Sequence, residues 1–206
     1  MLHFETVDSG TLELLKQIQC HTAFDQTRLV GGTALALQLG HRKSIDLDFF
    51  GQINVQPVAL RQILESYGNV SLRSTGFRIQ QFMVCGVQVD FVEYSYPWLD
   101  DPVCVEGLRL ASLRDIAAMK LAAITNRGTK KDFIDLAFLL DRFTLEQMFD
   151  CYTHKFSDGA VFPVLKSLVF FDDAEDDPLP NMLHPFDWIA AKQRIVAAVS
   201  SESLNG

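Results

Sequence analysis

The chain's organisation centres on the stretch Leu29-Val-Gly-Gly-Thr-Ala-Leu-Ala-Leu-Gln-Leu-Gly-His-Arg-Lys-Ser-Ile-Asp-Leu-Asp-Phe-Phe50. Its first residues predict the end of a short strand, which Gly31-Gly32 interrupt before a short helix from Thr33 to Leu39. Glycines at a strand-to-helix turn let backbone N–H groups approach a ligand closely, and a helix N-terminus favours anions. This part of the stretch therefore predicts a phosphate-binding turn.

Two carboxylates close the same stretch, Asp46 and Asp48. If both lie on a strand, both point to one face of the sheet. Neighbouring carboxylates repel each other unless a cation lies between them, and Mg²⁺ takes oxygen ligands of this kind while leaving positions for substrate phosphates. Each feature alone is common in ordinary turns and surface strands. Their order, with Arg42 and Ser44 between them, favours a nucleotide site.

A third carboxylate, Asp90, lies in the apolar run Val87-Gln-Val-Asp-Phe-Val-Glu93, which predicts a strand after a short hairpin connection at Cys85-Gly86. A carboxylate on such a strand is costly to bury unless it is paired, hydrogen-bonded or bound to metal. If this strand lies beside the one that carries Asp46 and Asp48, three carboxylates converge, enough to hold two Mg²⁺ ions. The alternative is an edge-strand aspartate that faces water.

The second half of the chain predicts helices. Leu113 to Thr125 form a strongly apolar helical pattern with Ser112 placed as its N-cap. Lys120 is the only cation in the central part of that helix, where it either extends from a packed face to water or serves the site. In the segment from Asn126 to Leu136, Asp132 and the carboxylate three residues later share one side of the next helix.

These segments resemble a known family. Gly31-Gly-Thr-Ala-Leu35, followed by Arg42-Lys-Ser-Ile-Asp-Leu-Asp48, resembles the first motif of nucleotidyltransferases of the DNA polymerase beta type, and more narrowly of the AbiEii/AbiGii-type toxin nucleotidyltransferases. Lys120 and the segment from Arg127 to Leu136 resemble the third motif of the same family, with Lys131 where arginine is more familiar. That exchange keeps the charge but loses the bidentate fork of a guanidinium.

The resemblance implies roles for residues at both motifs. It implies nucleotide binding by Gly31, Gly32, Thr33, Arg42, Ser44, Lys120 and Lys131; metal binding by Asp46, Asp48 and Asp90; and catalysis by Asp46, Asp48, Lys120 and Asp132. The implied cofactor is Mg²⁺ or Mn²⁺. The implied reaction transfers a nucleoside monophosphate from an NTP to a hydroxyl of RNA, tRNA or a protein, and a cognate antitoxin is the implied partner.

Composition limits the class of protein. Of 206 residues, 48% are hydrophobic and 21% charged, a balance typical of a globular protein. No apolar run approaches the ~20 residues that span a bilayer, and the N-terminus lacks the pattern of a signal peptide, so we expect a cytoplasmic protein with no membrane partner. The net charge of −8 argues against broad affinity for nucleic acid but is compatible with a local basic patch. The scattered cysteines, which predict buried free thiols and no zinc site, are Cys20, Cys85, Cys104 and Cys151.

The expected fold class is α+β or α/β, with a small mixed-sheet nucleotidyltransferase core over residues 1–104. Residues 105–206 are expected to form a helical domain that completes the active-site cleft. One alternative is a nucleotide-binding or protein-interaction module with the same fold and no turnover. A phosphatase of the haloacid-dehalogenase type also uses Asp-X-Asp, but it needs a hydrophobic strand before the first aspartate, and His41-Arg-Lys-Ser44 does not supply one.

Overall fold

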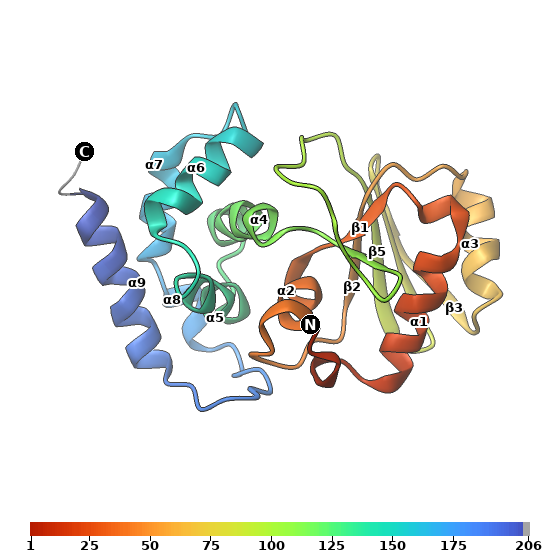
Figure 1. The fold of residues 1–206 in the computed structure, drawn as a ribbon, viewed down its shortest axis with the longest axis horizontal. Coiled ribbons are helices and arrows are strands. Elements are labelled where there is room, and N and C mark those ends of the chain that lie inside the picture. The colour runs from red at the N-terminus through yellow and green to blue at the C-terminus, as the bar shows by residue number, and fades with distance from the viewer. Residues whose placement is uncertain (204–206) are drawn as a thin grey trace. The chain divides into compact units, whose positions relative to one another are not determined.

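The computed structural model describes residues 1–203, and its contacts divide the chain into two compact units. The sheet unit holds residues 1–95 and 102–111, and the helical unit holds residues 96–101 and the chain from Ser112 onward. The sequence placed the boundary between residues 104 and 105, which is inside a strand of the sheet unit. In Figure 1 the strands run from orange to green, and the helices of the helical unit run from green to blue.

The sheet unit contains a seven-stranded mixed sheet with the order β3-β4-β5-β2-β1-β7-β6. Strands β2 and β5 are parallel neighbours, as are β1 and β7, and the other pairings are antiparallel. This mixed sheet, followed by helices, confirms the predicted fold class. The strand bounds are β1 Thr27–Leu29, β2 Leu47–Gly51, β3 Val70–Thr75, β4 Ile79–Val84, β5 Val87–Glu93, β6 Val103–Val105 and β7 Leu108–Leu110.

One face of this sheet packs into the core of the unit. Phe91 of β5 stacks on Phe24 at 5.0 Å and on Phe49 at 5.3 Å between ring centroids, and Phe82 of β4 meets it edge-on at 6.4 Å. These rings are buried, and each contributes about 1.5–3 kcal/mol by its removal from water. Because side chains alternate along a strand, Asp48 beside Phe49 points to the opposite face, where it is half-buried.

Helices of the sheet unit complete its architecture, and one of them begins at the glycine turn. Helix α2 starts at Gly31 rather than at Thr33, so the glycines form its first turn. Strand β2 starts at Leu47, so the expectation that Asp46 lies on this strand is wrong, and Asp46 belongs to the segment before it. The helical segments are η1 Phe4–Thr6, α1 Ser9–Cys20, η2 Thr22–Phe24, α2 Gly31–Leu39 and α3 Pro57–Glu65.

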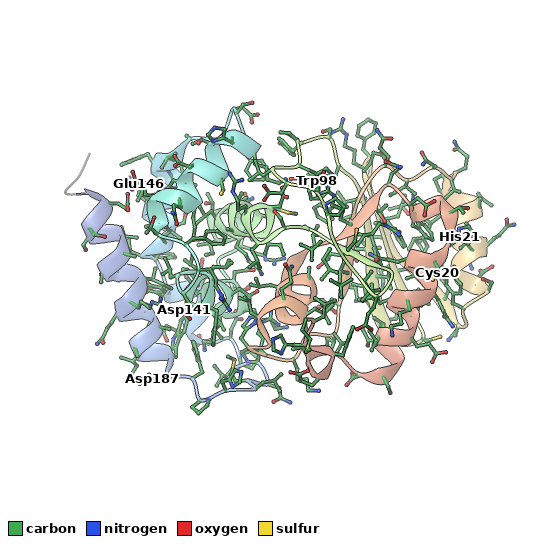
Figure 2. All side chains as sticks on the ribbon, in the orientation of Figure 1. Cys20, His21, Trp98, Asp141, Glu146 and Asp187 are labelled. Carbon is green, nitrogen blue, oxygen red and sulfur yellow. The ribbon has the colours of Figure 1, made fainter. Side chains whose placement is uncertain are left out.

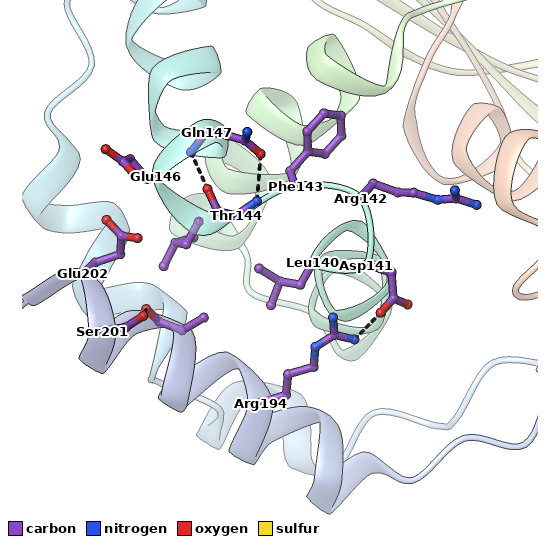
Figure 3. Close-up of a pocket in the computed structure, with 12 residues that line it drawn as sticks. Leu140, Asp141, Arg142, Phe143, Thr144, Glu146, Gln147, Arg194, Ser201 and Glu202 are labelled. Carbon is purple, nitrogen blue, oxygen red and sulfur yellow. Dashed lines mark hydrogen bonds and ion pairs between the residues drawn. The ribbon is translucent and has the colours of Figure 1, made fainter.

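Ser112 is the N-cap of α4, the first helix of the helical unit, as predicted. Its hydroxyl accepts a hydrogen bond of 3.0 Å from the backbone N–H of Asp115, which caps α4. Helix α6 begins with a complete capping box formed by Thr144 and Gln147 (Figure 3). The helices are α4 Leu113–Asn126, α5 Lys130–Leu139, α6 Leu145–Lys155, α7 Val161–Leu168, α8 Asp172–Glu175 and α9 Trp188–Ser203.

A buried ion pair explains why residues 96–101 belong to the helical unit. Lys155 Nζ lies 2.6 Å from Asp115 Oδ1, and both side chains are fully buried. The ammonium also donates to the carbonyl of Pro97 at 2.9 Å, and the backbone N–H of Leu99 donates to Asp115 at 3.0 Å. Lys155 is 4.5 Å from the ring centre of Trp98, which Figure 2 labels. Replacing either partner by an uncharged residue would leave a buried charge unpaired, so the ion pair fixes residues 96–101 against the helical unit.

Two further findings bear on predictions from the sequence. All four cysteines are free thiols, but Cys20 (labelled in Figure 2), Cys85 and Cys104 are exposed, so the prediction of burial is right only for Cys151. In the part of the chain that the structure describes, no helix combines the length and the apolar character needed to cross a membrane.

Candidate active site

The glycine turn fits closely under two charged side chains. Gly31 has φ +68°, a left-handed conformation that glycine adopts without strain. A Cβ on Gly31 would overlap Oδ2 of Asp48, and a Cβ on Gly32 would overlap Nη2 of Arg42. A side chain at either position would displace the carboxylate or the guanidinium that lies against the turn, and at Gly31 it would also strain the backbone.

The loop between α2 and β2 is tied back to this turn. The Thr33 hydroxyl lies 2.8 Å from Ser44 Oγ and also contacts the carbonyl of Asp46. Arg42 is buried, and its Nη1 donates to the carbonyl of Lys43 at 3.0 Å. The structure thus gathers the predicted nucleotide-binding residues of the first motif around one helix N-terminus, with a cation beside it, an arrangement that suits an anionic ligand.

One carboxylate of the first motif, Asp48, is paired with Asp90 through neighbouring strands. Asp48 of β2 and Asp90 of β5 are register partners on adjacent parallel strands, so both lie on the face opposite the aromatic core. Asp46 lies just before β2 and lines a cavity of about 380 Å³ together with Asp8, Thr11, Cys85 and Gln88. Among residues 1–203, no three or more His, Cys, Asp or Glu side chains are grouped closely enough to hold a metal ion.

Two glutamines orient Asp90. Its side chain is 8% exposed, and Gln81 Nε2 donates to Asp90 Oδ2 at 2.7 Å. Gln88 Nε2 lies 3.3 Å from Oδ1 of the same carboxylate. The sequence analysis missed both glutamines. The sequence does contain a signal for Gln81. The two-residue connection between β4 and β5 pairs Val84 with Val87, so the residue three positions before Val84 lies opposite Asp90.

A second charged cluster lies within the helical unit, between α4 and α5. Lys120 Nζ is 2.9 Å from Asp132 Oδ1 and 2.6 Å from Asp135 Oδ2, and all three side chains are at most 5% exposed. Arg127 approaches Asp132 with Nε at 2.8 Å and Nη2 at 3.0 Å, and the Thr129 hydroxyl donates to it at 2.7 Å. Asp132 is therefore fixed by three different side chains.

The protonation of Asp132 follows from those partners. Burial alone raises the pKa of its carboxyl, but the charges of Lys120 and Arg127 and the hydrogen bonds from Arg127 and Thr129 hold that pKa well below its ordinary value. Asp132 is therefore ionised throughout the neutral range. Lys131, the other predicted nucleotide-binding cation of this segment, is exposed.

The helical unit also has a hollow of about 510 Å³ beside the loop after α5 (Figure 3). It is lined by that loop, by the start of α6 and by α9, and an ion pair of 2.7 Å between Arg194 and Asp141 lies on its wall. None of the predicted site residues lines this hollow, so it is separate from both charged clusters.

A mixed sheet with carboxylates beside a glycine turn, followed by helices, is the fold of the nucleotidyltransferases. MenT4, a nucleotidyltransferase toxin of Mycobacterium tuberculosis H37Rv, matches this structure with a TM-score of 0.55 and 18% identity, over 91% of this chain and 80% of that one. JHP933 of Helicobacter pylori matches with a TM-score of 0.55 and 17% identity, over 97% and 98% of the two chains.

The sequence identifies the family within that fold. The model of the family described as "Nucleotidyl transferase AbiEii toxin, Type IV TA system" matches residues 13–203, and the chain belongs to this family. An uncharacterised protein of Aquifex aeolicus (strain VF5) is 34% identical over 155 residues, which are 72% of this chain and 75% of that protein. The predicted resemblance to the AbiEii-type nucleotidyltransferases is thus confirmed.

Proposed function

We propose that this protein transfers a nucleoside monophosphate from an NTP to a hydroxyl acceptor, with pyrophosphate leaving. The observation that carries the proposal is the glycine turn: the Asp48 carboxylate and the Arg42 guanidinium lie directly against it, and Asp90 is in register with Asp48. Membership of a nucleotidyl transferase family supports the same reaction class.

In this proposal the first motif binds the triphosphate. Backbone N–H groups at the start of α2 would bind the phosphates, beside the Asp48 and Arg42 side chains that lie against Gly31 and Gly32. Arg42 supplies a positive charge there, and Thr33 and Ser44, joined at 2.8 Å, hold the loop in place. Positioned donors at a helix N-terminus favour the phosphate anion and require little reorganisation when it binds.

The chemistry of the carboxylate donors suits a hard divalent cation, and joint binding would require Asp46 to move toward Asp48 and Asp90, because among residues 1–203 no three such side chains are grouped closely enough to hold a metal ion. Asp48 and Asp90 present carboxylate oxygens at register-paired positions, and Asp46 precedes Asp48 by two residues. We propose that these three residues hold Mg²⁺ or Mn²⁺, and when bound the ion supplies Lewis-acid stabilisation of the phosphoryl oxygens. The residues themselves orient the ligand oxygens, and Asp90 keeps its direction through the amide of Gln81 at 2.7 Å.

For the helical unit we propose the roles that the family resemblance implies. Lys120 and Lys131 serve the nucleotide phosphates, and Asp132 is a catalytic or orienting carboxylate. Because Lys120 Nζ is 2.9 Å from Asp132, the orienting role is the one that the geometry favours: the carboxylate fixes the direction of the ammonium. Arg127, 63% exposed, is a further cation in contact with the same carboxylate and accessible to solvent.

We also propose that the protein is the toxin of a toxin–antitoxin pair, which its family description supports, and that a cognate antitoxin controls it in the cytoplasm. The acceptor of the nucleotide is then a cellular RNA, such as a tRNA, or a protein side chain. A module that binds nucleotide without turnover is the competing assignment, and one experiment separates the two.

The test is label transfer. The purified protein is incubated with Mg²⁺, each α-labelled NTP in turn and total cellular RNA, beside Asp48→Asn and the matched control Asp25→Asn, an exposed aspartate of the same unit. We expect label on RNA or protein with the wild type and the control, and none with Asp48→Asn. Mg²⁺-dependent NTP binding without transfer would favour the binding module. Equal transfer by Asp48→Asn would overturn the site assignment.

A further inference from the structure

The hairpin formed by β3 and β4 exposes an aromatic ring that the core does not use. Phe77, in the turn between the strands, is 99% exposed, and Leu72 of β3 is 49% exposed. Strand β3 is also an edge of the sheet, next to β4 only (Figure 1). Single exposed apolar residues are common on proteins, so the ring acquires meaning only from what surrounds it.

One arginine lies against this ring, and a second lies on the neighbouring strand. Arg78 follows Phe77 directly, and its guanidinium carbon is 5.9 Å from the centre of the ring. Its Nη1 donates to Ser95 Oγ at 2.9 Å, which holds the guanidinium at this position. Arg73 is exposed at the irregularity where the register of β3 against β4 shifts between Leu72 and Ser74. The hairpin therefore presents one aromatic ring and one guanidinium group at its turn and a second guanidinium group on β3.

The segment that contains α3 and the hairpin is opposite in charge to the protein as a whole, and acidic residues return at Asp90 and Glu93 of β5. Residues 54–89 contain three arginines and one acidic residue, a net charge of +2, whereas the whole chain carries −8. The one acid, Glu65, is paired with Arg61 at 2.8 Å on α3. Arg73 and Arg78 thus form a local basic patch in an acidic protein, which attracts a polyanion to this hairpin rather than to the rest of the surface.

We infer that the β3–β4 hairpin is a docking platform for a single-stranded polynucleotide, with one base stacked on Phe77 and phosphates at Arg73 and Arg78. An exposed aromatic ring beside cations is the combination that binds single strands, because every base offers a π-face and the backbone is anionic. Stacking needs an unpaired base, so an intact duplex gains only the charge contacts.

The platform is joined to the carboxylates by continuous sheet. Gln81 of β4 is the register partner of Asp90, and Phe77 lies four residues before Gln81. At ~3.3 Å per residue these four residues, which begin in the turn, span at most about 13 Å, or about four nucleotides at ~3.4 Å each. A strand stacked on Phe77 can therefore present its terminal hydroxyl at Asp90. This step rests on the proposed function and names its acceptor as the single-stranded end of a nucleic acid.

Binding is measured by fluorescence anisotropy with a labelled single-stranded RNA of about twelve nucleotides, within the usual footprint of single-strand binders. The assay contains neither NTP nor divalent ion. Phe77→Leu keeps an apolar side chain but removes the π-face, and Phe77→Tyr keeps the π-face. Val58→Ala and Arg61→Gln are the matched controls, since Val58 is 72% exposed and both lie on α3 of the same unit.

We expect Phe77→Leu to weaken binding roughly five- to 150-fold, and Phe77→Tyr to bind like the wild type. Arg73→Gln and Arg78→Gln should each lower the slope of log affinity against log salt by about 0.7, while Arg61→Gln leaves it unchanged because Glu65 already neutralises that arginine. The same RNA annealed to its complement should bind more weakly than the single strand.

Two results would overturn the platform: no single-strand binding by the wild type, or equal binding by Phe77→Leu. In either case the exposed ring is free for a protein partner instead. Asp48→Asn should bind the RNA like the wild type, because the platform does not include that carboxylate. Wild-type protein that binds the RNA but transfers no nucleotide therefore contradicts the proposed reaction, and unchanged binding and transfer by Phe77→Leu contradict only the platform.

Discussion

The buried carboxylates of the two charged clusters accept hydrogen bonds from different kinds of donor. In the sheet unit, Asp90 accepts hydrogen bonds from the neutral amides of Gln81 and Gln88. In the helical unit, Asp132 accepts from the cations Lys120 and Arg127. Neutral donors orient a carboxylate without compensating its charge, so that charge stays available for a ligand cation. Cationic donors use the charge to hold the fold together.

The largest expected effect comes from removing Lys120, the cation that the two buried carboxylates of the helical unit share. Lys120→Met leaves the buried carboxylates of Asp132 and Asp135 without their shared ammonium, which should destabilise the fold by about 3–5 kcal/mol. Urea unfolding followed by circular dichroism measures this. Lys131→Met, an exposed lysine of the same segment, is the matched control and should change stability by less than about 0.5 kcal/mol. Similar stabilities for the two variants would show that the cluster does not hold the unit together.

The glycine turn should be sensitive in function before it is sensitive in stability. Gly31→Ala places a Cβ against Oδ2 of Asp48 at a residue with φ +68°. We expect nucleotide transfer to fall by at least about 10²-fold, the scale of losing one preorganised contact to a transition state. The strained conformation should also cost on the order of 1 kcal/mol of stability.

The control for that variant is Gly10→Ala in α1, where an added Cβ meets nothing within 4 Å. Its transfer rate should match the wild type, and helix propensity should stabilise it by up to about 1 kcal/mol. Full transfer activity in Gly31→Ala would mean that the approach of Asp48 to the turn is not needed for the reaction.

The neutral donors of Asp90 give an intermediate effect. Gln81→Ala removes the amide at 2.7 Å and frees the carboxylate to rotate, so Mn²⁺ should bind about 10–100-fold more weakly, as is usual when a metal ligand loses its hydrogen-bond support. Titration of Mn²⁺ by electron paramagnetic resonance measures this without turnover. Gln80→Ala, on the other face of β4, is the control. Equal Mn²⁺ affinity in both variants would remove the positioning role of Gln81.

The sequence predicted which residues of the first motif lie together better than it predicted the contacts of the helical cluster, for a physical reason. Gly31, Thr33, Arg42 and Ser44 are close in the chain, so a strand, a turn and a helix suffice to gather them. The pairing of Asp48 with Asp90 depends on β2 and β5 becoming neighbours in the sheet, which no local pattern encodes. From the sequence, the approach of Asp90 to Asp48 follows only if their two strands are neighbours, and the strand order of the sheet shows that they are.

Burial was the quantity that the sequence could not supply for the helical unit. Lys120 was recognised as an isolated cation on an apolar helix, and both water and the active site were considered for it. The structure places its ammonium against two carboxylates from α5, twelve and fifteen residues later in the chain. Whether such a cation is paired depends on how two helices pack, and helical periodicity gives the face of each helix but not its partner.

The smallest expected effect comes from removing Arg127, the exposed cation that contacts Asp132. Arg127 is 63% exposed, so solvent screens its attraction to Asp132 and its removal should cost about 1 kcal/mol or less. The pKa of Asp132 is depressed in the folded state, so its stabilising contribution is complete above the unfolded pKa and is lost as pH falls from about 4 through the folded pKa. Arg127→Gln raises that folded pKa toward its ordinary value. Acid unfolding of the variant should therefore occur at slightly higher pH than that of the wild type, and the difference in stability should be largest near neutral pH and shrink as Asp132 becomes protonated. If the pH of acid unfolding does not change, Lys120 and Thr129 alone lower the pKa of Asp132.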